Sequence, residues 1–423
     1  MKPRLFTTLF LLLSLTLSQH LRAADAAQRP GIWPDPKLLD ELQRKKTTWI
    51  YRESDVPPYQ IPDPLVCADG TRITTKEQWE KKGRPETLEL FRKYVYGRSP
   101  KPGQVSFATL TSDPKALDGR ATHNRVKITI TDAAKSFSFE TSLLIPNAAA
   151  GPVPAFILIN NRPTASADPT RKQKDGFWPA EDIIAHGYAT AVFETNAVDP
   201  DKADAASRAK GVRAVFNAGT PGQDAWATIA AWAWGASRVL DYLQTQPRID
   251  SSKVAVIGHS RGGKTALWAG AEDTRFALVI SNDSGCGGAA LSKRIFGETV
   301  KTINRGFPYW FCDNFKKYDD REGDLPVEQN QLLALIAPRA LCVGSAEADF
   351  WADQRGEFLS LAHASPVFAL YGFNGLRDEE FPALDTPLIR DRVSYHIRRG
   401  VHNLTSYDWN HYMDFADRVW RKQ

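Results

Sequence analysis

The chain has 423 residues, 42% of them hydrophobic and 24% charged, and carries a formal net charge of +5. This composition is typical of a globular protein and excludes a low-complexity chain, and the length allows one large α/β domain or two ordinary ones. The four cysteines (Cys67, Cys286, Cys312 and Cys342) show no Cys-x-x-Cys spacing, which argues against a zinc site and a disulfide-dependent scaffold. This pattern allows either one disulfide or buried free thiols.

The first residues have the zones of a secretory signal peptide. Basic Lys2 and Arg4 precede an apolar run at 5–17, and small residues follow. We therefore predict a signal peptide over residues 1–24, cleaved between 23 and 27, and an exported protein that is periplasmic or secreted. The apolar run is too short to span a bilayer comfortably, and no later run reaches the roughly 18 apolar residues of a membrane helix. Cleavage lowers the formal charge to +2, which gives no support for nucleic-acid binding.

Residues 28–423 should form a single domain that begins with an extended segment. Residues 28–100 are rich in proline, charged and aromatic residues, and they show helical periodicity only near 87–95. We therefore predict that they wrap around the rest of the domain. Between residues 105 and 145, polar and apolar residues alternate, which indicates antiparallel strands.

From residue 153 onward, short apolar segments alternate with helical stretches. The apolar runs predict strands at 153–159, 189–193, 254–257, 277–280, 340–343 and 393–398. This order predicts an α/β fold, a three-layer sandwich with a mostly parallel sheet and antiparallel strands at its N-terminal edge. The longest predicted helix covers 224–244. Its tryptophans, Trp226, Trp232 and Trp234, should fill the core rather than stack on a sugar. The irregular segment 162–179 is long enough to predict a functional loop.

One stretch carries the strongest signal for chemistry. Gly258-His-Ser-Arg-Gly262 joins the predicted strand at 254–257 to a predicted helix at 265–271. A Gly-x-Ser-x-Gly turn between a strand and a helix exposes the serine hydroxyl at the end of the sheet in α/β-hydrolases. A glycine-rich turn can also merely join two elements, but this context marks Ser260 as a nucleophile.

A serine nucleophile needs a general base, and the base needs an acid to orient it. In an α/β-hydrolase the chain order is serine, acid, histidine. His402 follows the last predicted strand and is the expected base, with His411 as the competitor. His363 lies in a predicted helix and His396 in a predicted strand, so both should be structural.

Two aspartates satisfy this order. Asp283 follows the predicted strand at 277–280, and Asp349 follows the predicted strand at 340–343. Asp349 occupies the usual place of the acid, whereas Asp283 could equally be a solvated turn residue. We favour Asp349, and a role shared by both aspartates stays open.

The developing oxyanion needs hydrogen-bond donors. The backbone N–H of Arg261, directly after the nucleophile, is the expected first donor, and the loop Asn160-Asn-Arg162 is the candidate for the second. Lys264 lies four residues after Ser260 and therefore on the same helix face. Two cations beside the serine indicate an acidic or strongly polar acyl group, unless they point to solvent or pair with structural carboxylates.

Three motifs together indicate a family. They are Gly-His-Ser-Arg-Gly-Gly-Lys at 258–264, Asp-Ser-Gly-Cys-Gly-Gly-Ala-Ala-Leu at 283–291 and His-Asn-Leu-Thr-Ser-Tyr-Asp-Trp at 402–409. With them the chain resembles bacterial glucuronoyl esterases of carbohydrate esterase family 15, from about residue 153 to 416. The resemblance implies hydrolysis of the ester between 4-O-methyl-glucuronic acid side chains of glucuronoxylan and lignin alcohols, through an acyl-enzyme.

The resemblance also implies roles for single residues. Arg261 would stabilise the oxyanion through its side chain, and Lys264, Glu298 and Trp351 would contact the hydroxyls of the uronate ring. From the sequence alone, Glu298 is a surface charge and Trp351 a loop-edge aromatic residue.

The chain departs from the family pattern at two positions. Many members have glutamate at the position of Asp283, and others place the acid at the position of Asp349, so the identity of the acid stays unresolved. His259 stands where fungal relatives have a cysteine, so we expect no disulfide beside the active site. The implied mechanism needs no metal or organic cofactor.

Other functions remain as alternatives. An acetylxylan or other carbohydrate esterase of the same fold would need no pair of cations. A non-catalytic polysaccharide-binding protein on a hydrolase scaffold would have no physical need for Ser260, His402 and two acids together. As the partner we predict a lignin-carbohydrate ester or glucuronoxylan fragment, with no nucleic acid or membrane, and we expect a monomer.

Overall fold

The structure is a computed structural model that describes residues 36–46, 48–216 and 222–420. The predicted signal peptide, residues 1–24, lies outside the described residues. The first strands are β1 (Gln104–Ala116), β2 (Ala121–Asp132) and β3 (Lys135–Pro146). The later strands are β4 (Val153–Asn160), β5 (Ala189–Glu194), β6 (Ile249–His259), β7 (Leu278–Asn282), β8 (Ala340–Ala346), β9 (Leu388–Ile389) and β10 (Val393–Arg398).

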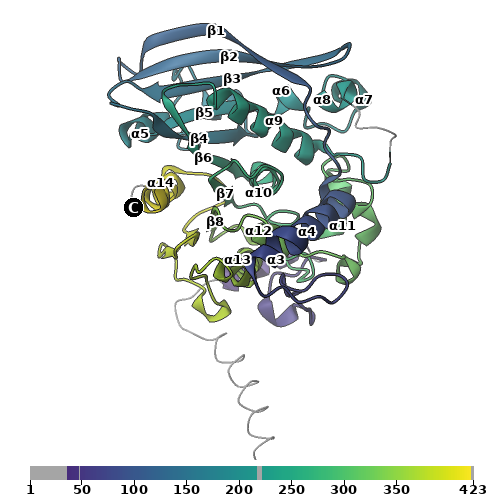
Figure 1. Cartoon of the computed structure of the whole chain (residues 1–423). Helices are drawn as coiled ribbons and strands as arrows, with labels where there is room; N and C mark the ends of the chain where they lie inside the picture. Colours follow the sequence, from purple (N-terminus) through teal and green to yellow (C-terminus); the bar gives the residue numbers. More distant parts are fainter. Residues whose placement is uncertain (1–35, 47, 217–221, 421–423) are drawn as a thin grey trace, which may run out of the picture.

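These strands form a ten-stranded sheet in the order β1-β2-β3-β5-β4-β6-β7-β8-β10-β9 (Figure 1). The neighbours from β5 to β10 pair in parallel, whereas β1, β2 and β3 are antiparallel at one edge and β9 is antiparallel at the other. The predicted α/β-hydrolase architecture is confirmed, and every predicted strand overlaps an observed one. The apolar runs located these strands because a parallel strand covered on both faces is apolar throughout.

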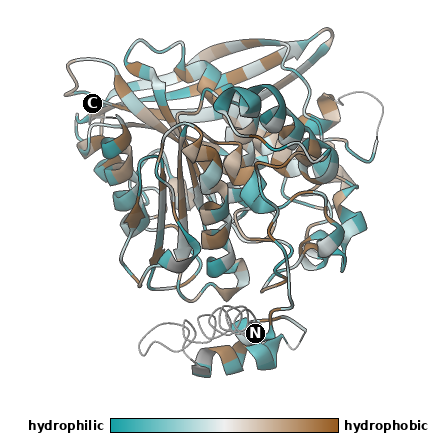
Figure 2. Cartoon of the chain, turned by 60° about the horizontal axis from the view of Figure 1, so that its bottom comes forward, coloured by the Kyte–Doolittle hydropathy of each residue, from teal (hydrophilic) through white to brown (hydrophobic). Residues whose placement is uncertain are grey.

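Helices cover both faces of the sheet. One face carries α9 (Thr228–Leu243), α10 (Arg261–Glu272), α12 (Gln329–Ala334) and α13 (Gln354–Ala369), and the other carries α5 (Ala180–Ala185) and α14 (Ser406–Trp420). Along β4, Ile157 and Ile159 belong to the first core, while Phe156 and Leu158 belong to the second. This alternation of side chains divides the interior into two apolar layers. Figure 2 shows hydrophobic residues concentrated along the central strands.

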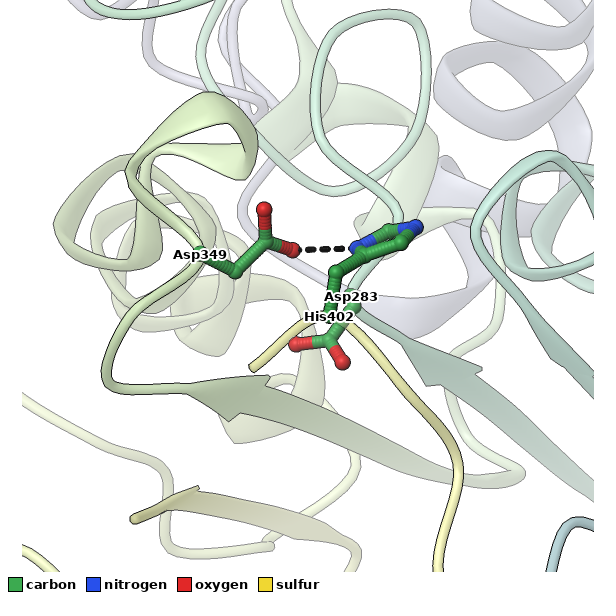
Figure 3. A group of neighbouring side chains, drawn as sticks. All are labelled: Asp283, Asp349 and His402. Carbon is green, nitrogen blue, oxygen red and sulfur yellow. Dashed lines mark hydrogen bonds and ion pairs between the residues drawn. The ribbon is translucent and has the colours of Figure 1, made fainter. Parts of the chain in front are cut away.

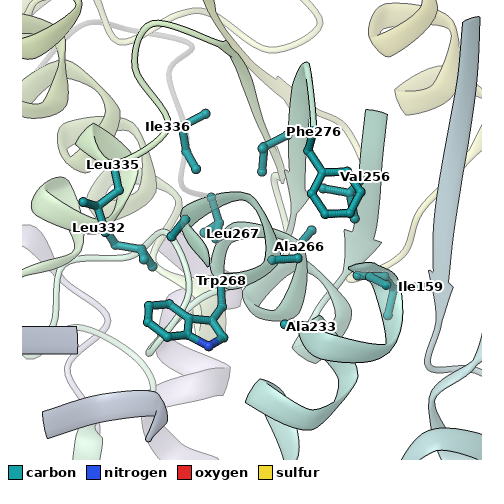
Figure 4. Packing of buried hydrophobic residues seen from close by; sticks show 14 of the residues in the cluster. Ile159, Ala233, Val256, Ala266, Leu267, Trp268, Phe276, Leu332, Leu335 and Ile336 are labelled. Atoms are coloured by element: carbon teal, nitrogen blue, oxygen red, sulfur yellow. The ribbon is translucent and has the colours of Figure 1, made fainter. Parts of the chain in front are cut away.

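Helix α10 lies within the larger core. Its Leu267 and Trp268 are fully buried and belong to the same core as Phe276 and Ile336 (Figure 4). The Trp268 ring also stacks on Tyr96, with ring centroids 4.4 Å apart. The helix that begins directly after Ser260 is therefore anchored along its length, which holds the start of the helix in place.

Helix α9 begins at Thr228, four residues later than predicted. The residues before it pair with the N-terminal segment instead, because Arg98 donates from its backbone to the Asp224 carbonyl at 2.9 Å, and Ala227 donates to the Tyr96 carbonyl at 3.0 Å. Helix α13 has the same length of 16 residues as α9, so α9 is not the longest single helix. Trp232 and Trp234 in α9, and Trp226 just before this helix, are buried in the core as predicted.

The N-terminal segment is more helical than predicted. A helix α2 (Pro36–Lys45) lies near its start, and residues 76–96 form consecutive helical turns that include α3 (Lys76–Gln78) and α4 (Arg84–Phe91). A capping box between Thr75 and Gln78 starts this run. A π-helical segment at 79–83 interrupts the 3.6-residue period and explains why the start of the run was not predicted, and a second one covers 92–96.

The remaining helices and the loops complete the described chain. The short helices are α6 (Thr195–Val198), α7 (Ala205–Arg208), α8 (Val212–Val215) and α11 (Val300–Gly306). The segment 162–179 is irregular as predicted, apart from one short turn at 164–167, and Trp409 of α14 donates to its Phe177 carbonyl at 2.9 Å. All four cysteines are free and buried. No helix among the described residues has the length and apolarity needed to cross a membrane.

The turn between β6 and α10 depends on two glycines. Ser260 has a φ of 58°, a left-handed conformation that is uncommon for a residue with a side chain. A Cβ atom on Gly258 would lie 2.1 Å from the Gly262 carbonyl oxygen, and one on Gly262 would lie 3.2 Å from the Ile159 carbonyl oxygen. Only glycine at position 258 lets the chain reverse this tightly.

We expect Gly258→Ala to lower the free energy of unfolding by about 2 kcal/mol or more, since the added methyl group meets backbone that has no room to move. Thermal unfolding followed by circular dichroism measures this loss. Gly306→Ala is the matched control, because a Cβ there meets nothing within 4 Å. Equal melting temperatures for the two variants would contradict this account of the turn.

Candidate active site

The predicted catalytic residues lie at the carboxyl ends of four parallel strands. Ser260 follows β6, Asp283 follows β7, Asp349 lies three residues past β8, and His402 lies four residues past β10. In an open parallel sheet, functional sites form at this edge. A cavity of about 220 Å³ is lined by all eight predicted site residues, together with five others. The eight are Ser260, Arg261, Lys264, Asp283, Glu298, Asp349, Trp351 and His402.

His402 and Asp349 are directly bonded. His402 Nδ1 lies 2.5 Å from Asp349 Oδ2 (Figure 3). A carboxylate can only accept a hydrogen bond, so the ring donates from Nδ1 and leaves Nε2 as a proton acceptor. The His402 ring also packs on His259, the residue before the nucleophile, with centroids 4.4 Å apart. This pair can therefore act as an oriented general base next to Ser260.

Asp283 has different surroundings. It is 1% exposed, and neither of its carboxylate oxygens has a hydrogen-bond partner among the described residues. Its nearest positive group is the Arg398 guanidinium, 3.6 Å away. Burial, and then the nearby Asp349 carboxylate, raise the pKa of Asp283 well above its ordinary value. The geometry thus favours Asp349 as the partner of His402, while Asp283 lies below the ring in Figure 3.

These same three side chains are the group in the described structure that could hold a metal ion. One ligand atom each from Asp283, Asp349 and His402 lies within 4.8 Å of the others. The Nδ1 atom of His402, however, faces Asp349 with a proton, and the Arg398 guanidinium already supplies positive charge beside Asp283. The donor set therefore suits proton transfer better than metal binding.

The two cations beside the nucleophile are both held by the protein. Arg261 donates from Nη2 to the Asn161 carbonyl at 2.8 Å, and its Nε lies 2.6 Å from Asp201 in an ion pair. Lys264 is 4% exposed and donates from Nζ to the Ser284 carbonyl at 2.5 Å. Its Nζ lies 4.0 Å from Glu298 Oε2. Both cations line the cavity as predicted, and each has a carboxylate partner.

Glu298 is buried, not a surface charge. It is 8% exposed, and burial raises its pKa while the Lys264 ammonium opposes that shift. The N-terminal segment covers this part of the site, since Gly297 donates to the Ile50 carbonyl at 2.8 Å. The Trp49 ring packs edge-on against Trp351, with centroids 5.0 Å apart. Trp351 itself is 44% exposed, so it can present a face to a ligand.

One donor of the loop Asn160-Asn-Arg162, the predicted source of the second oxyanion donor, is already engaged. The backbone N–H of Arg162 donates to Asn160 Oδ1 at 3.0 Å, so that N–H is occupied. The next carbonyl, on Asn161, instead receives the Arg261 guanidinium. The loop therefore orients the Arg261 side chain. The backbone N–H of Arg261 is the first N–H of α10, so it has no acceptor within the helix.

The other histidines lie elsewhere. His396 is buried in β10 and bonded to Asp408 at 2.8 Å, and His363 in α13 pairs with Asp378. His411 lies in α14, where its ring contacts His396 and Tyr407. His402 lines the cavity, whereas His411, the other candidate for the base, does not.

Glu357 is a supporting residue that the sequence reasoning missed. This fully buried α13 carboxylate accepts from the backbone N–H groups of Ser284 and Gly285 at 2.8 and 2.9 Å, and from the Ser345 hydroxyl at 2.6 Å. It therefore fixes the loop after β7 on which Asp283 and the acceptor for Lys264 lie. The available signal for this residue in the sequence was its position, because Glu357 is an acidic residue directly before the mostly apolar stretch Phe-Leu-Ser-Leu.

Comparison with known proteins agrees with this geometry. A family model described as "Glucuronyl esterase, fungi" matches residues 128–372. A curated protein named carbohydrate esterase MZ0003, from an unknown prokaryotic organism, is 39% identical over 414 residues, which cover 91% of this chain and 94% of that protein. The chain belongs to the glucuronoyl esterase family.

Solved structures of this family share the fold. The glucuronoyl esterase from Solibacter usitatus aligns with a TM-score of 0.81 at 38% identity, over 87% of this chain and all of that one. A structure described as a promiscuous CE15 esterase from the marine bacterial metagenome aligns with a TM-score of 0.78 at 39% identity, over 88% of this chain and all of that one. Family and fold thus agree with the resemblance found in the sequence motifs.

Glu357 predicts a pH dependence of stability. Burial raises the pKa of Glu357 to about 7 in the folded protein, above that of an unfolded chain, so its contribution is complete at low pH and is lost as the pH rises through 7. We expect the melting temperature of Glu357→Gln, relative to wild type, to rise between pH 5 and pH 8. Differential scanning calorimetry across this range measures it, with exposed Glu140→Gln as the control. A constant difference would contradict the raised pKa.

Proposed function

We propose that this member of the family hydrolyses esters of glucuronic acid through a serine acyl-enzyme. The observation that carries the proposal is a single cavity that contains Ser260, the Asp349–His402 pair and the buried pair Lys264–Glu298. The first three residues supply acyl-transfer chemistry, and the buried pair supplies polar groups that suit a sugar acid.

The reaction follows from the roles of these groups. His402 Nε2 takes the Ser260 proton as the hydroxyl oxygen attacks the ester carbonyl, and Asp349 stabilises the imidazolium that forms. The Arg261 backbone N–H and guanidinium stabilise the oxyanion. His402 then gives its proton to the leaving alcohol, which leaves a glucuronoyl ester on Ser260. Water, activated by His402, hydrolyses that ester and releases the free acid.

The uronate ring would lie against the cationic side of the cavity. Lys264 and Glu298 are both buried and lie 4.0 Å apart, so a ligand hydroxyl placed between them can accept from one and donate to the other. The exposed face of Trp351 can pack on the apolar face of the sugar. A site built to satisfy hydroxyl groups rejects ligands that lack them.

The wider setting belongs to the same proposal. The acyl part would be the 4-O-methyl-glucuronic acid side chain of glucuronoxylan and the alcohol part a lignin alcohol. The basic, apolar and small-residue zones of residues 1–24 support export to the periplasm or the medium. The enzyme would act there as a monomer of one domain.

A broader carboxylic ester hydrolase is the second candidate. It is favoured by the description of one 39% identical structure as promiscuous. Phe307, Trp310 and Trp351 also line the cavity, and these apolar surfaces can contact acyl groups other than a uronate.

Hydrolysis of benzyl glucuronate and of benzyl acetate separates these two candidates. We expect wild type to prefer the glucuronate, and Lys264→Ala to lower kcat/KM for the glucuronate by about 10- to 100-fold, because a hydrogen bond from a charged group is lost. Acetate hydrolysis should change far less. Lys253→Ala removes a half-buried lysine of the same strand–turn–helix unit, outside the cavity wall, and serves as the control. Ser260→Ala should abolish both reactions. If wild type hydrolyses the acetate faster than the glucuronate, and Lys264→Ala leaves the acetate rate unchanged, the broad esterase is favoured.

Single replacements of the two aspartates test which of them acts as the acid partner of His402. Asp349→Asn should lower kcat about a thousandfold, since the amide favours the wrong tautomer of His402. Asp283→Asn should lower it less than about tenfold, because its carboxyl makes no hydrogen bond to His402 in the described structure and is held toward the neutral form by burial. Steady-state kinetics on benzyl glucuronate measures both, and the reverse order would transfer the role to Asp283.

A further inference from the structure

The cations that line the described cavity are matched by carboxylates of the protein. Arg261 is paired with Asp201, and Lys264 is paired with Glu298. The carboxylate of Asp349 also faces the cavity beside His402. The described groups around the substrate position therefore carry no excess of positive charge, although the sequence indicated two cations.

Asp201 is the partner that lies outside the cavity wall. It follows α6, and its side chain is 13% exposed. Its Oδ2 pairs with the Arg261 Nε, and its Oδ1 accepts from Trp310 Nε1 at 2.7 Å and from the Tyr309 hydroxyl at 2.8 Å. Two hydrogen bonds and one ion pair thus hold this carboxylate in one place. Both Arg261 and Trp310 line the cavity.

This balance of charge bears on the difference between substrate and product. The ester is neutral at its reacting carbon, whereas the acid released by hydrolysis carries a carboxylate at the same place. A cation without a partner beside Ser260 would attract that carboxylate much more strongly than the ester, because charges attract strongly in a poorly hydrated cavity. The enzyme would then bind its own product more tightly than its substrate, and turnover would slow.

We propose that Asp201 is a specificity-determining residue that offsets the charge of Arg261, so that the site accepts the neutral glucuronate ester and releases the anionic acid. The inference rests on the proposed function, since it concerns the product of that reaction. Asp201 leaves the remaining guanidinium hydrogens free to donate to the oxyanion, while it removes most of the long-range attraction for a full carboxylate charge.

Asp201→Asn tests the proposal with little change of shape. The amide oxygen still accepts from Trp310, but the negative charge is gone. We expect the inhibition constant of free glucuronate, measured against benzyl glucuronate hydrolysis, to fall about tenfold, while KM for the ester changes less than about threefold. The gain in glucuronate affinity should shrink as salt is raised, since salt screens the attraction.

Two variants separate charge from structure. Tyr309→Phe removes one hydrogen bond to Asp201 and keeps the carboxylate, so its inhibition constant should match that of wild type. Asp201→Glu restores the charge and should return the inhibition constant toward the wild-type value. An inhibition constant for Asp201→Asn within twofold of wild type would overturn the proposal, and so would equal changes in KM and in the inhibition constant.

A binding measurement keeps the test independent of turnover. Calorimetric titration of glucuronate into Ser260→Ala and into Ser260→Ala/Asp201→Asn should show the same tenfold difference in affinity, and equal affinities would overturn the proposal. Failure of wild type to hydrolyse benzyl glucuronate would instead refute the proposed function, so the two failures are distinct.

Discussion

The tight turn between β6 and α10 is the constraint on which the site depends. Gly258 and Gly262 approach so closely that no side chain fits at the first of them, and Ser260 is forced into a left-handed conformation between them. Helix α10 then begins at once, so Arg261 lies in its first turn and Lys264 lies one turn after the serine. The proposed nucleophile, oxyanion donor and sugar-binding cation thus come from five consecutive residues on one rigid unit.

Buried charges around this unit are arranged in pairs. Lys264 faces Glu298, and Arg398 lies between Asp408, to which it donates at 2.8 Å, and Asp283. Burying an unpaired charge costs several kcal/mol, so each pair restricts how the surrounding loops can pack. Through these contacts the loop after β7 is tied to α10 on one side and to β10 and α14 on the other.

Local signals were enough for the sheet and for the turn that holds Ser260. The apolar runs of β4, β6 and β8 and the Gly-x-Ser-x-Gly turn each occupy consecutive residues, so periodicity and spacing find them. The helical run at 76–96 was only partly predicted because a π-helical segment at 79–83 breaks its period. The burial of Glu298 has no local signal at all, since residues about 250 positions earlier in the chain cover it. Distant packing also brings His402 into contact with Asp349 and not with Asp283, two candidates that chain order could not separate.

The two aspartates show why a second acid near the base need not share its work. Like charges this close cannot both ionise without mutual repulsion, and Asp283 is the more deeply buried of the two. Burial and the nearby Asp349 carboxylate raise the pKa of Asp283, which holds this group toward its neutral form. In the proposed mechanism the task of stabilising the imidazolium of His402 therefore falls to Asp349, which is bonded to the ring.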